Sequence, residues 1–166
     1  SLDDSLATDR KLWSALLCYS LVFAATVSRP GVVAASYARY SSDLQDRRSI
    51  VDQQEKCRVR AFQDELAILP EFEFADEAVS GATWSRPGLD ALLDAVCANR
   101  IHVLVVESLS RLARDSVLTL QTLQELVHKY DMRIISIDDG IDTQSNVNWE
   151  VVAAIFGVQN QEYLRV

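Results

Sequence analysis

The chain has 166 residues, of which 49% are apolar and 24% charged, so it is long enough to form one domain with a substantial core. Its formal net charge of −8 makes the whole chain a poor electrostatic partner for nucleic acid. Its two histidines and three widely separated cysteines leave little for a zinc site, a disulfide framework or a Ser-His-Asp triad, and they indicate a reducing, cytoplasmic compartment.

The basic residues are strongly biased towards one type. Of the 16 lysines and arginines, only Lys11, Lys56 and Lys129 are lysine. Arginine is the side chain suited to bidentate contacts with phosphate. An acidic chain that is rich in arginine can therefore hold a local positive pocket on a negative body.

Residues 1–30 differ from the rest of the chain. Residues 12–28 form an uncharged, largely apolar run between Lys11 and Arg29. The run is marginal for a membrane span, which usually needs about 20 apolar residues, and it loosely resembles a secretory signal. Because the segment ahead of it is neutral rather than basic, we expect an N-terminal extension with an apolar helix that packs on the domain or on a partner, or upstream sequence with no role.

From residue 31 onward, apolar strand patterns alternate with amphipathic helix patterns. Strands are predicted at residues 32–35, 67–74, 101–106 and 133–137. Helices are predicted at residues 49–63, 87–97, 116–129 and 149–166. Because strands that alternate with helices form parallel sheets, we expect a three-layer α/β domain with a largely parallel central sheet and helices on both faces.

Local signals refine two of these elements. Ser49 follows a polar loop at residues 43–48 and is predicted as the N-cap of its helix, with Asp52 completing a partial capping box. Pro70 interrupts the second strand, which is therefore predicted to lie at an edge of the sheet or to form two short pieces.

Polar groups gather at the ends of the predicted strands. Arg39 and Ser41 follow the first strand, and on an extended segment two residues apart they point to the same side. A hydroxyl beside an always-ionised guanidinium suits chemistry on a phosphate, although an ordinary polar strand end has the same composition. The second strand leads into a loop with Ser80 and Arg86, and the third precedes Arg111. Carboxyl ends of parallel strands meet at one edge, which predicts a ligand site there.

Four sequence blocks carry a resemblance to a known family, and they occur in the family's order and spacing. They are residues 37–42 with Gln45, residues 49–54, residues 80–89 and residues 109–115, and residues 137–141 add a weaker fifth block. Over roughly residues 32–166 the chain resembles the catalytic domain of the serine recombinases, the resolvase and invertase family that includes the large serine integrases.

The resemblance implies a mechanism and a set of site residues. The nucleophile would be Ser41, which would attack a DNA phosphodiester and form a covalent 5′-phosphoserine intermediate. The adjacent Ser42 is a rival that points to the opposite side of an extended strand. The resemblance implies no metal or cofactor. Four arginines would surround the scissile phosphate, namely Arg39, Arg86, Arg111 and Arg114. Supporting polar positions would be Tyr37, Gln45, Gln53 and Ser80.

The chain departs from the family pattern in two respects. Ser110 stands where resolvases usually have an aspartate, and Tyr163 stands where an arginine is frequent. Relatives also continue through a long helix into a separate DNA-binding domain, so we expect the catalytic domain at residues 31–166 to be truncated in its C-terminal helix.

The partners implied by the resemblance are DNA and further copies of the chain, as homodimers that assemble into tetramers on DNA. Without the basic region of its relatives, the chain is expected to bind DNA weakly and without sequence choice. Two other functions stay open. The chain can be a non-catalytic fragment that dimerises with full-length recombinases and regulates them, or a phosphate-binding α/β domain that acts on nucleotides, although it lacks a Gly-rich phosphate loop.

Overall fold

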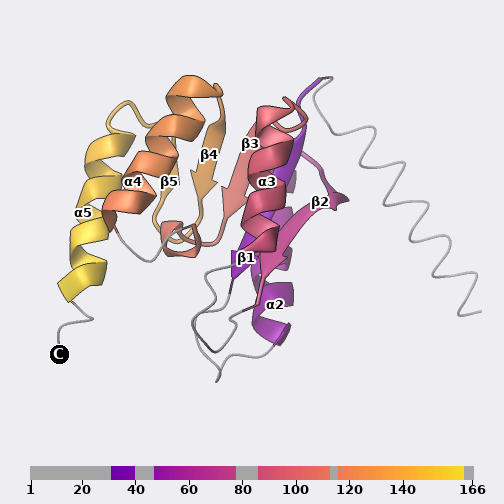
Figure 1. The fold of residues 1–166 in the computed structure, drawn as a ribbon, viewed down its shortest axis with the longest axis horizontal. Helices are drawn as coiled ribbons and strands as arrows, with labels where there is room; N and C mark the ends of the chain where they lie inside the picture. The colour runs from indigo at the N-terminus through magenta and orange to yellow at the C-terminus, as the bar shows by residue number, and fades with distance from the viewer. Residues whose placement is uncertain (1–30, 40–46, 78–85, 113–115, 163–166) are drawn as a thin grey trace, which may run out of the picture.

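The computed structural model describes residues 31–39, 47–77, 86–112 and 116–162, which form a five-stranded sheet flanked by helices (Figure 1). The strand order is β2-β1-β3-β4-β5. The pairs β1–β2, β1–β3 and β3–β4 are parallel, and β4–β5 is antiparallel. The strands are β1 (Ala34–Arg39), β2 (Ile68–Asp76), β3 (Val103–Val106), β4 (Arg133–Ser136) and β5 (Ile141–Asp142).

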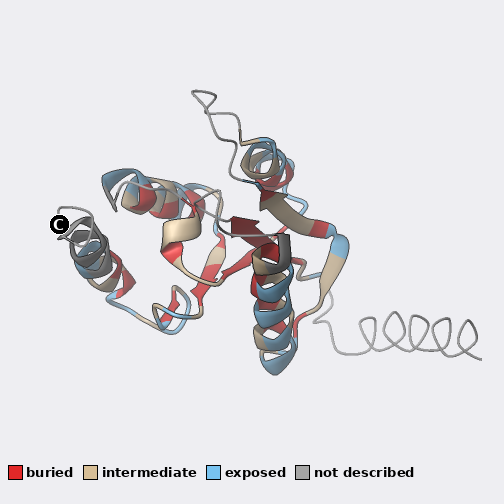
Figure 2. Cartoon of the chain, turned by 90° about the horizontal axis from the view of Figure 1, so that it is seen from below, coloured by how far each residue is buried: buried red, intermediate tan, exposed pale blue. Residues whose placement is uncertain are grey.

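Helices cover both faces of the sheet, which confirms the predicted three-layer α/β fold (Figure 2). Helix α2 (Arg47–Gln63) packs on one face through Cys57 and Ala61. The other face is covered by α3 (Pro87–Cys97), α4 (Ser116–Gln124) and α5 (Trp149–Glu162). A 3₁₀-helix, η1 (Leu109–Arg111), follows β3, and a π-helical turn, η2 (Glu125–Lys129), extends α4.

The central strand β3 shows why an apolar run becomes a buried strand here. All of its residues are buried, and successive side chains alternate between the two cores. Leu104 and Val106 belong to the core beneath α3, α4 and α5. Val103 and Val105 belong to the core beneath α2. A strand covered on both faces needs apolar side chains at every position, which is the pattern of a central parallel strand.

Four local features differ from the predictions. Strand β1 was predicted at residues 32–35 but runs from Ala34 to Arg39, so Arg39 lies within the strand. Helix α2 begins at Arg47, so the predicted loop ends earlier, and Ser49 is not its N-cap. The Ser49 hydroxyl instead accepts a hydrogen bond from Gln53 Nε2 at 3.2 Å, one turn along the helix. The short antiparallel strand β5 was not predicted.

Strand β2 lies at an edge of the sheet, as Pro70 predicted, and it is continuous through that proline. The register between β1 and β2 shifts between Ala34 and Ser36, and Pro70 lies within the irregular stretch of β2. A missing N–H group is tolerated there because the regular ladder is interrupted.

The predicted apolar helix in residues 1–30 lies outside the described residues. Within the part of the chain that is described, no helix combines the length and the apolar character needed to cross a membrane.

Helix α3 approaches β2 at Gly88. A Cβ atom added to Gly88 would lie 2.2 Å from the backbone oxygen of Ala75. The first turn of α3 therefore rests directly on the backbone of β2, and only glycine permits that contact. This close approach places Arg86, which immediately precedes α3, beside the ends of the central strands.

We predict that Gly88→Ala lowers the free energy of unfolding by about 2 kcal/mol, because the new methyl group forces helix and strand apart. Alanine in a helix is normally more stabilising than glycine. A decrease in the free energy of unfolding would therefore indicate the steric contact with β2 and not helix propensity. The measurement is urea denaturation, with Asp94→Ala on the exposed face of α3 as the control. A Gly88→Ala chain as stable as the original would contradict the close approach.

Candidate active site

The carboxyl ends of the parallel strands bring polar residues from four parts of the chain to one edge of the sheet. Arg39 ends β1 and Asp76 ends β2. Strand β3 is followed by Glu107 and then by η1, while Asp139 follows β4. This is the edge at which open α/β sheets bind ligands, so the predicted convergence of strand ends is present.

Two arginines donate hydrogen bonds to backbone carbonyls at η1. Arg39 donates from Nε to the carbonyl of Arg111 at 3.0 Å and from Nη2 to that of Ser110 at 2.8 Å. Arg86 donates from Nη2 to the same Arg111 carbonyl at 2.8 Å and from Nη1 to the carbonyl of Leu112. The carbonyls at the end of a short helix lack partners within it. Here they are the acceptors for two guanidinium groups, and we call residues 110–112 the η1 carbonyl segment.

A buried tyrosine connects Arg86 to a buried carboxylate. The Tyr37 hydroxyl donates to Asp76 Oδ2 at 2.8 Å and accepts from Arg86 Nη2 at 2.7 Å. Burial raises the pKa of Tyr37, and the hydrogen bond to Asp76 raises it further, while Arg86 acts in the opposite direction. The hydroxyl therefore stays protonated and serves as a donor to Asp76.

Asp76 was missed by the sequence analysis, although it is only 4% exposed and has a central place in the site. Its Oδ1 accepts from the N–H of Gly88 at 2.7 Å and its Oδ2 from that of Leu89 at 2.9 Å. These are N–H groups of the first turn of α3, which the helix itself leaves without partners. Asp76 therefore joins β2, the tyrosine of β1 and the start of α3.

Gln53 fixes the backbone of Arg39. Its Oε1 accepts from the N–H of Arg39 at 3.1 Å, and its Nε2 donates to the carbonyl of Arg39 at 3.2 Å. The side chain is almost fully buried, and both ends of its amide are engaged in this way. Gln53 thus connects α2 to the end of β1, and the chain continues from there to Ser41.

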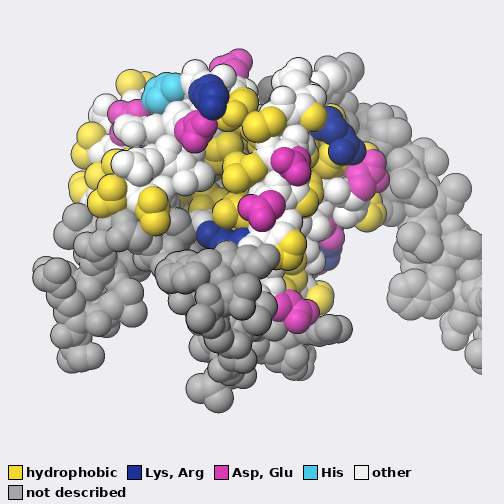
Figure 3. Space-filling view, in the orientation of Figure 1, with side chains coloured by type: hydrophobic (Ala, Val, Ile, Leu, Met, Phe, Trp, Pro, Cys, Tyr) yellow, Lys and Arg dark blue, Asp and Glu magenta, His cyan; other side chains and the backbone are white. Residues whose placement is uncertain are grey.

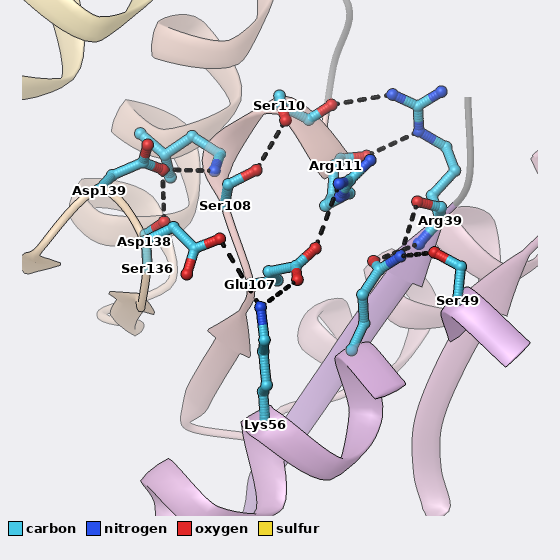
Figure 4. A network of polar contacts seen from close by, with 12 residues as sticks. Arg39, Ser49, Lys56, Glu107, Ser108, Ser110, Arg111, Ser136, Asp138 and Asp139 are labelled. Carbon is cyan, nitrogen blue, oxygen red and sulfur yellow. Dashed lines mark hydrogen bonds and ion pairs between the residues drawn. The ribbon is translucent and has the colours of Figure 1, made fainter. Parts of the chain in front are cut away.

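The side chains around η1 form a second set of contacts (Figure 4). Arg111 donates from Nη2 to Glu107 Oε2 at 3.1 Å, and Lys56 donates to Glu107 Oε1 at 2.7 Å. The hydroxyls of Ser108 and Ser110 lie 2.6 Å apart. Asp139 Oδ2 accepts both the N–H of Leu109 at 2.7 Å and the Ser136 hydroxyl at 2.6 Å, so it fixes the start of η1.

A comparison of the sequence with protein families matches residues 34–166 to the family described as "Resolvase, N terminal domain". The chain belongs to this family. The resemblance inferred from the four sequence blocks is therefore confirmed. A comparison with curated proteins gives no match.

Solved structures with similar folds include catalytic domains of serine recombinases. The N-terminal catalytic domain of TP901-1 integrase matches with a TM-score of 0.62 at 23% identity, over 78% of this chain and 97% of that one. A resolvase family site-specific recombinase from Streptococcus pneumoniae matches with a TM-score of 0.62 at 23% identity, over 80% and 90%. The catalytic domain of ISC1926 TnpA, an IS607-like serine recombinase, matches at 0.53 and 21%, over 76% and 80%. At these identities the likeness shows a shared fold.

The site residues predicted for a resolvase domain divide into two groups. The described residues bring Tyr37, Arg39, Gln53, Arg86 and Arg111 together at one edge of the sheet. The predicted nucleophile and three predicted polar or basic side chains lie outside the described residues, namely Ser41, Gln45, Ser80 and Arg114. Their positions and roles stay predictions, as do the roles of the first group towards DNA.

We predict that Tyr37→Phe lowers the free energy of unfolding of this resolvase domain by about 2 kcal/mol, because Asp76 and Arg86 each lose a buried hydrogen-bond partner. The measurement is chemical denaturation. Tyr130→Phe is a matched control, since the partners of its hydroxyl are exposed groups, Cys97 Sγ at 3.3 Å and the side chain of Lys129. Equal losses of unfolding free energy in the two variants would show that the Tyr37 hydroxyl contributes no more to stability than the hydroxyl of Tyr130.

Proposed function

We propose that this chain is the catalytic domain of a site-specific DNA recombinase that cleaves and rejoins DNA through a covalent 5′-phosphoserine at Ser41. Family membership over residues 34–166 supports the reaction class. The observation that carries the proposal is the gathering of Arg39, Arg86 and Arg111 at the η1 carbonyl segment, beside the end of β1, from which the chain continues to Ser41.

The chemistry consists of two exchanges at phosphorus. The Ser41 hydroxyl loses its proton and its oxygen bonds to phosphorus, while the bond from phosphorus to the 3′ oxygen breaks. The departing 3′ oxygen takes up a proton, and the 5′ phosphate stays on the serine. In the second step a 3′ hydroxyl of a partner strand attacks the phosphoserine and displaces the serine. The covalent intermediate keeps a phosphodiester-like bond throughout, so no further energy source is required.

The arginines suit the charge that develops in these steps. Guanidinium groups neutralise the phosphoryl oxygens as the transition state forms. Within the described residues, Nε of Arg86 and Nε of Arg111 are buried and make no hydrogen bond. An unpaired buried donor is costly, and a phosphate oxygen that enters beside either group would supply the acceptor.

We further propose that the chain acts on DNA as a homodimer, and that two dimers pair into a tetramer on the DNA. The supporting observation is an exposed apolar surface on two adjacent helices, α4 and α5 (Figure 3). Its exposed side chains are Val117, Leu118, Val151 and Ile155, which we call the α4–α5 apolar face. Exposed apolar groups of this kind mark interaction sites.

We predict that Ser41→Ala abolishes adduct formation with DNA. The full chain would be fused to a DNA-binding domain of known site, and offered a duplex with two inverted copies of that site around a randomised centre. The adduct is detected as a band that survives denaturation, and peptide mass spectrometry locates the phosphoserine.

The neighbouring hydroxyl provides the control, because Ser42→Ala should leave the adduct within about threefold of the unmodified chain. An adduct that persists in Ser41→Ala, or that disappears only in Ser42→Ala, would refute the assignment of the nucleophile. A released 3′ phosphate in place of a 3′ hydroxyl would refute the direction of attack.

We predict that Val151→Asp shifts the chain towards monomer, because a charge in an apolar interface is desolvated without a partner. Sedimentation velocity over a range of concentrations measures the dissociation constant, which should rise by about tenfold or more. Val59→Asp is the matched control, since Val59 is also half exposed but lies on α2. Equal effects of the two substitutions would place the contact elsewhere.

A further inference from the structure

Glu107 stands where β3 ends, and its carboxylate is shared by two cations from different elements (Figure 4). Its Oε2 accepts from Arg111 at 3.1 Å and its Oε1 from Lys56 of α2 at 2.7 Å. The side chain of Glu107 is only 13% exposed and that of Arg111 only 20%. A carboxylate held from both sides in a sheltered position is fixed in direction as well as in place.

Arg111 is thereby fixed at two points. Its backbone carbonyl accepts hydrogen bonds from Arg39 and Arg86, which hold the main chain. Its guanidinium is held through one N–H group by Glu107. A guanidinium has five N–H groups, so a single anchor leaves the others for a ligand while it limits rotation of the group.

No carboxylate comes to Arg111 from the neighbouring position 110. Resolvases usually have an aspartate there, whereas the Ser110 hydroxyl of this chain pairs with that of Ser108 at 2.6 Å. Among the described residues, Glu107 is the carboxylate within ion-pair distance of Arg111. The anion beside this arginine therefore comes from the end of β3.

We infer that Glu107 is a positioning residue for DNA cleavage, which orients the Arg111 guanidinium towards the scissile phosphate in place of the aspartate that position 110 lacks. The inference rests on the proposed recombinase function. Glu107 acts through Arg111, and the contacts described for it are all to protein groups.

Lys56 keeps this arrangement compatible with an anionic substrate. Glu107 alone would cancel the charge of Arg111, but Lys56 shares that carboxylate at 2.7 Å and itself lies 4.0 Å from the carboxylate of Asp138. The hydrogen bond to Glu107 raises the pKa of Lys56, so the lysine stays charged. A phosphate that approaches Arg111 therefore meets a carboxylate that is already shared with a second cation.

The test compares Glu107→Gln with Glu55→Gln in the full chain and in the fusion used for adduct formation. Glu55 is a matched control because it also pairs with an arginine, Arg58 at 2.7 Å, but on the exposed surface of α2. The first measurement is the NMR order parameter of the Arg111 Nε–H bond in the chain without DNA. The second is the rate of adduct formation at saturating DNA, together with the DNA concentration that gives half the maximal rate.

We expect Glu107→Gln to lower the order of the Arg111 guanidinium and to slow adduct formation by about 10- to 100-fold. The half-saturating DNA concentration should stay within about twofold, because the phosphate contacts of the fused DNA-binding domain dominate affinity. Glu55→Gln should change none of these quantities. Should Glu107→Gln fail to fold, Glu107→Asp, whose carboxylate is retracted by one methylene, is examined by the same measurements and should show the same direction of change.

The outcomes separate the two hypotheses. An unmodified chain that forms no adduct overturns the proposed function, and this inference with it. An active chain in which Glu107→Gln behaves like Glu55→Gln overturns this inference alone. An Arg111 guanidinium that keeps its order in Glu107→Gln overturns it as well, whatever the rate, since the carboxylate then does not position the arginine.

Discussion

The backbone carbonyls of residues 110–112 are the acceptors on which this edge of the molecule depends. They accept hydrogen bonds from two sheltered guanidinium groups, and those groups in turn satisfy carbonyls that η1 leaves open. Arg39 brings the end of β1 to this segment, and Arg86 brings the start of α3. The other buried polar residues of the site act on these two arginines, since Tyr37 holds Arg86 and Gln53 holds the backbone of Arg39.

The same arrangement accounts for how an acidic chain gathers arginines at one edge of its sheet. Three carboxylates at this edge accept hydrogen bonds from protein groups. Asp76 accepts the N–H groups that begin α3, Asp139 accepts the N–H that begins η1, and Glu107 is shared between two cations. The net charge of −8 is thus a property of the whole chain and not of this edge.

Elements with strong local patterns were predictable from the sequence. The continuous apolar run of β3 and the stripe of α3 predicted a central parallel strand and its covering helix. Strand β5 has two residues, too few to show any period, and Ser49 has the residue type of an N-cap but pairs with Gln53 inside the helix. Asp76 and Glu107 were not identified because their importance comes from partners far along the chain, Tyr37 and Lys56, and no local pattern encodes such pairs.

The irregular edge strand has a consequence for how copies of this domain can meet. An exposed, regular strand edge is a template on which further chains can add as strands, which leads to open-ended aggregation. In β2 the proline at position 70 removes a donor, the shifted register bends the ladder, and Glu71 adds an exposed charge. At the opposite edge, β5 is too short to serve as a template. Neither edge of the described sheet is therefore a good template for the addition of strands from another copy.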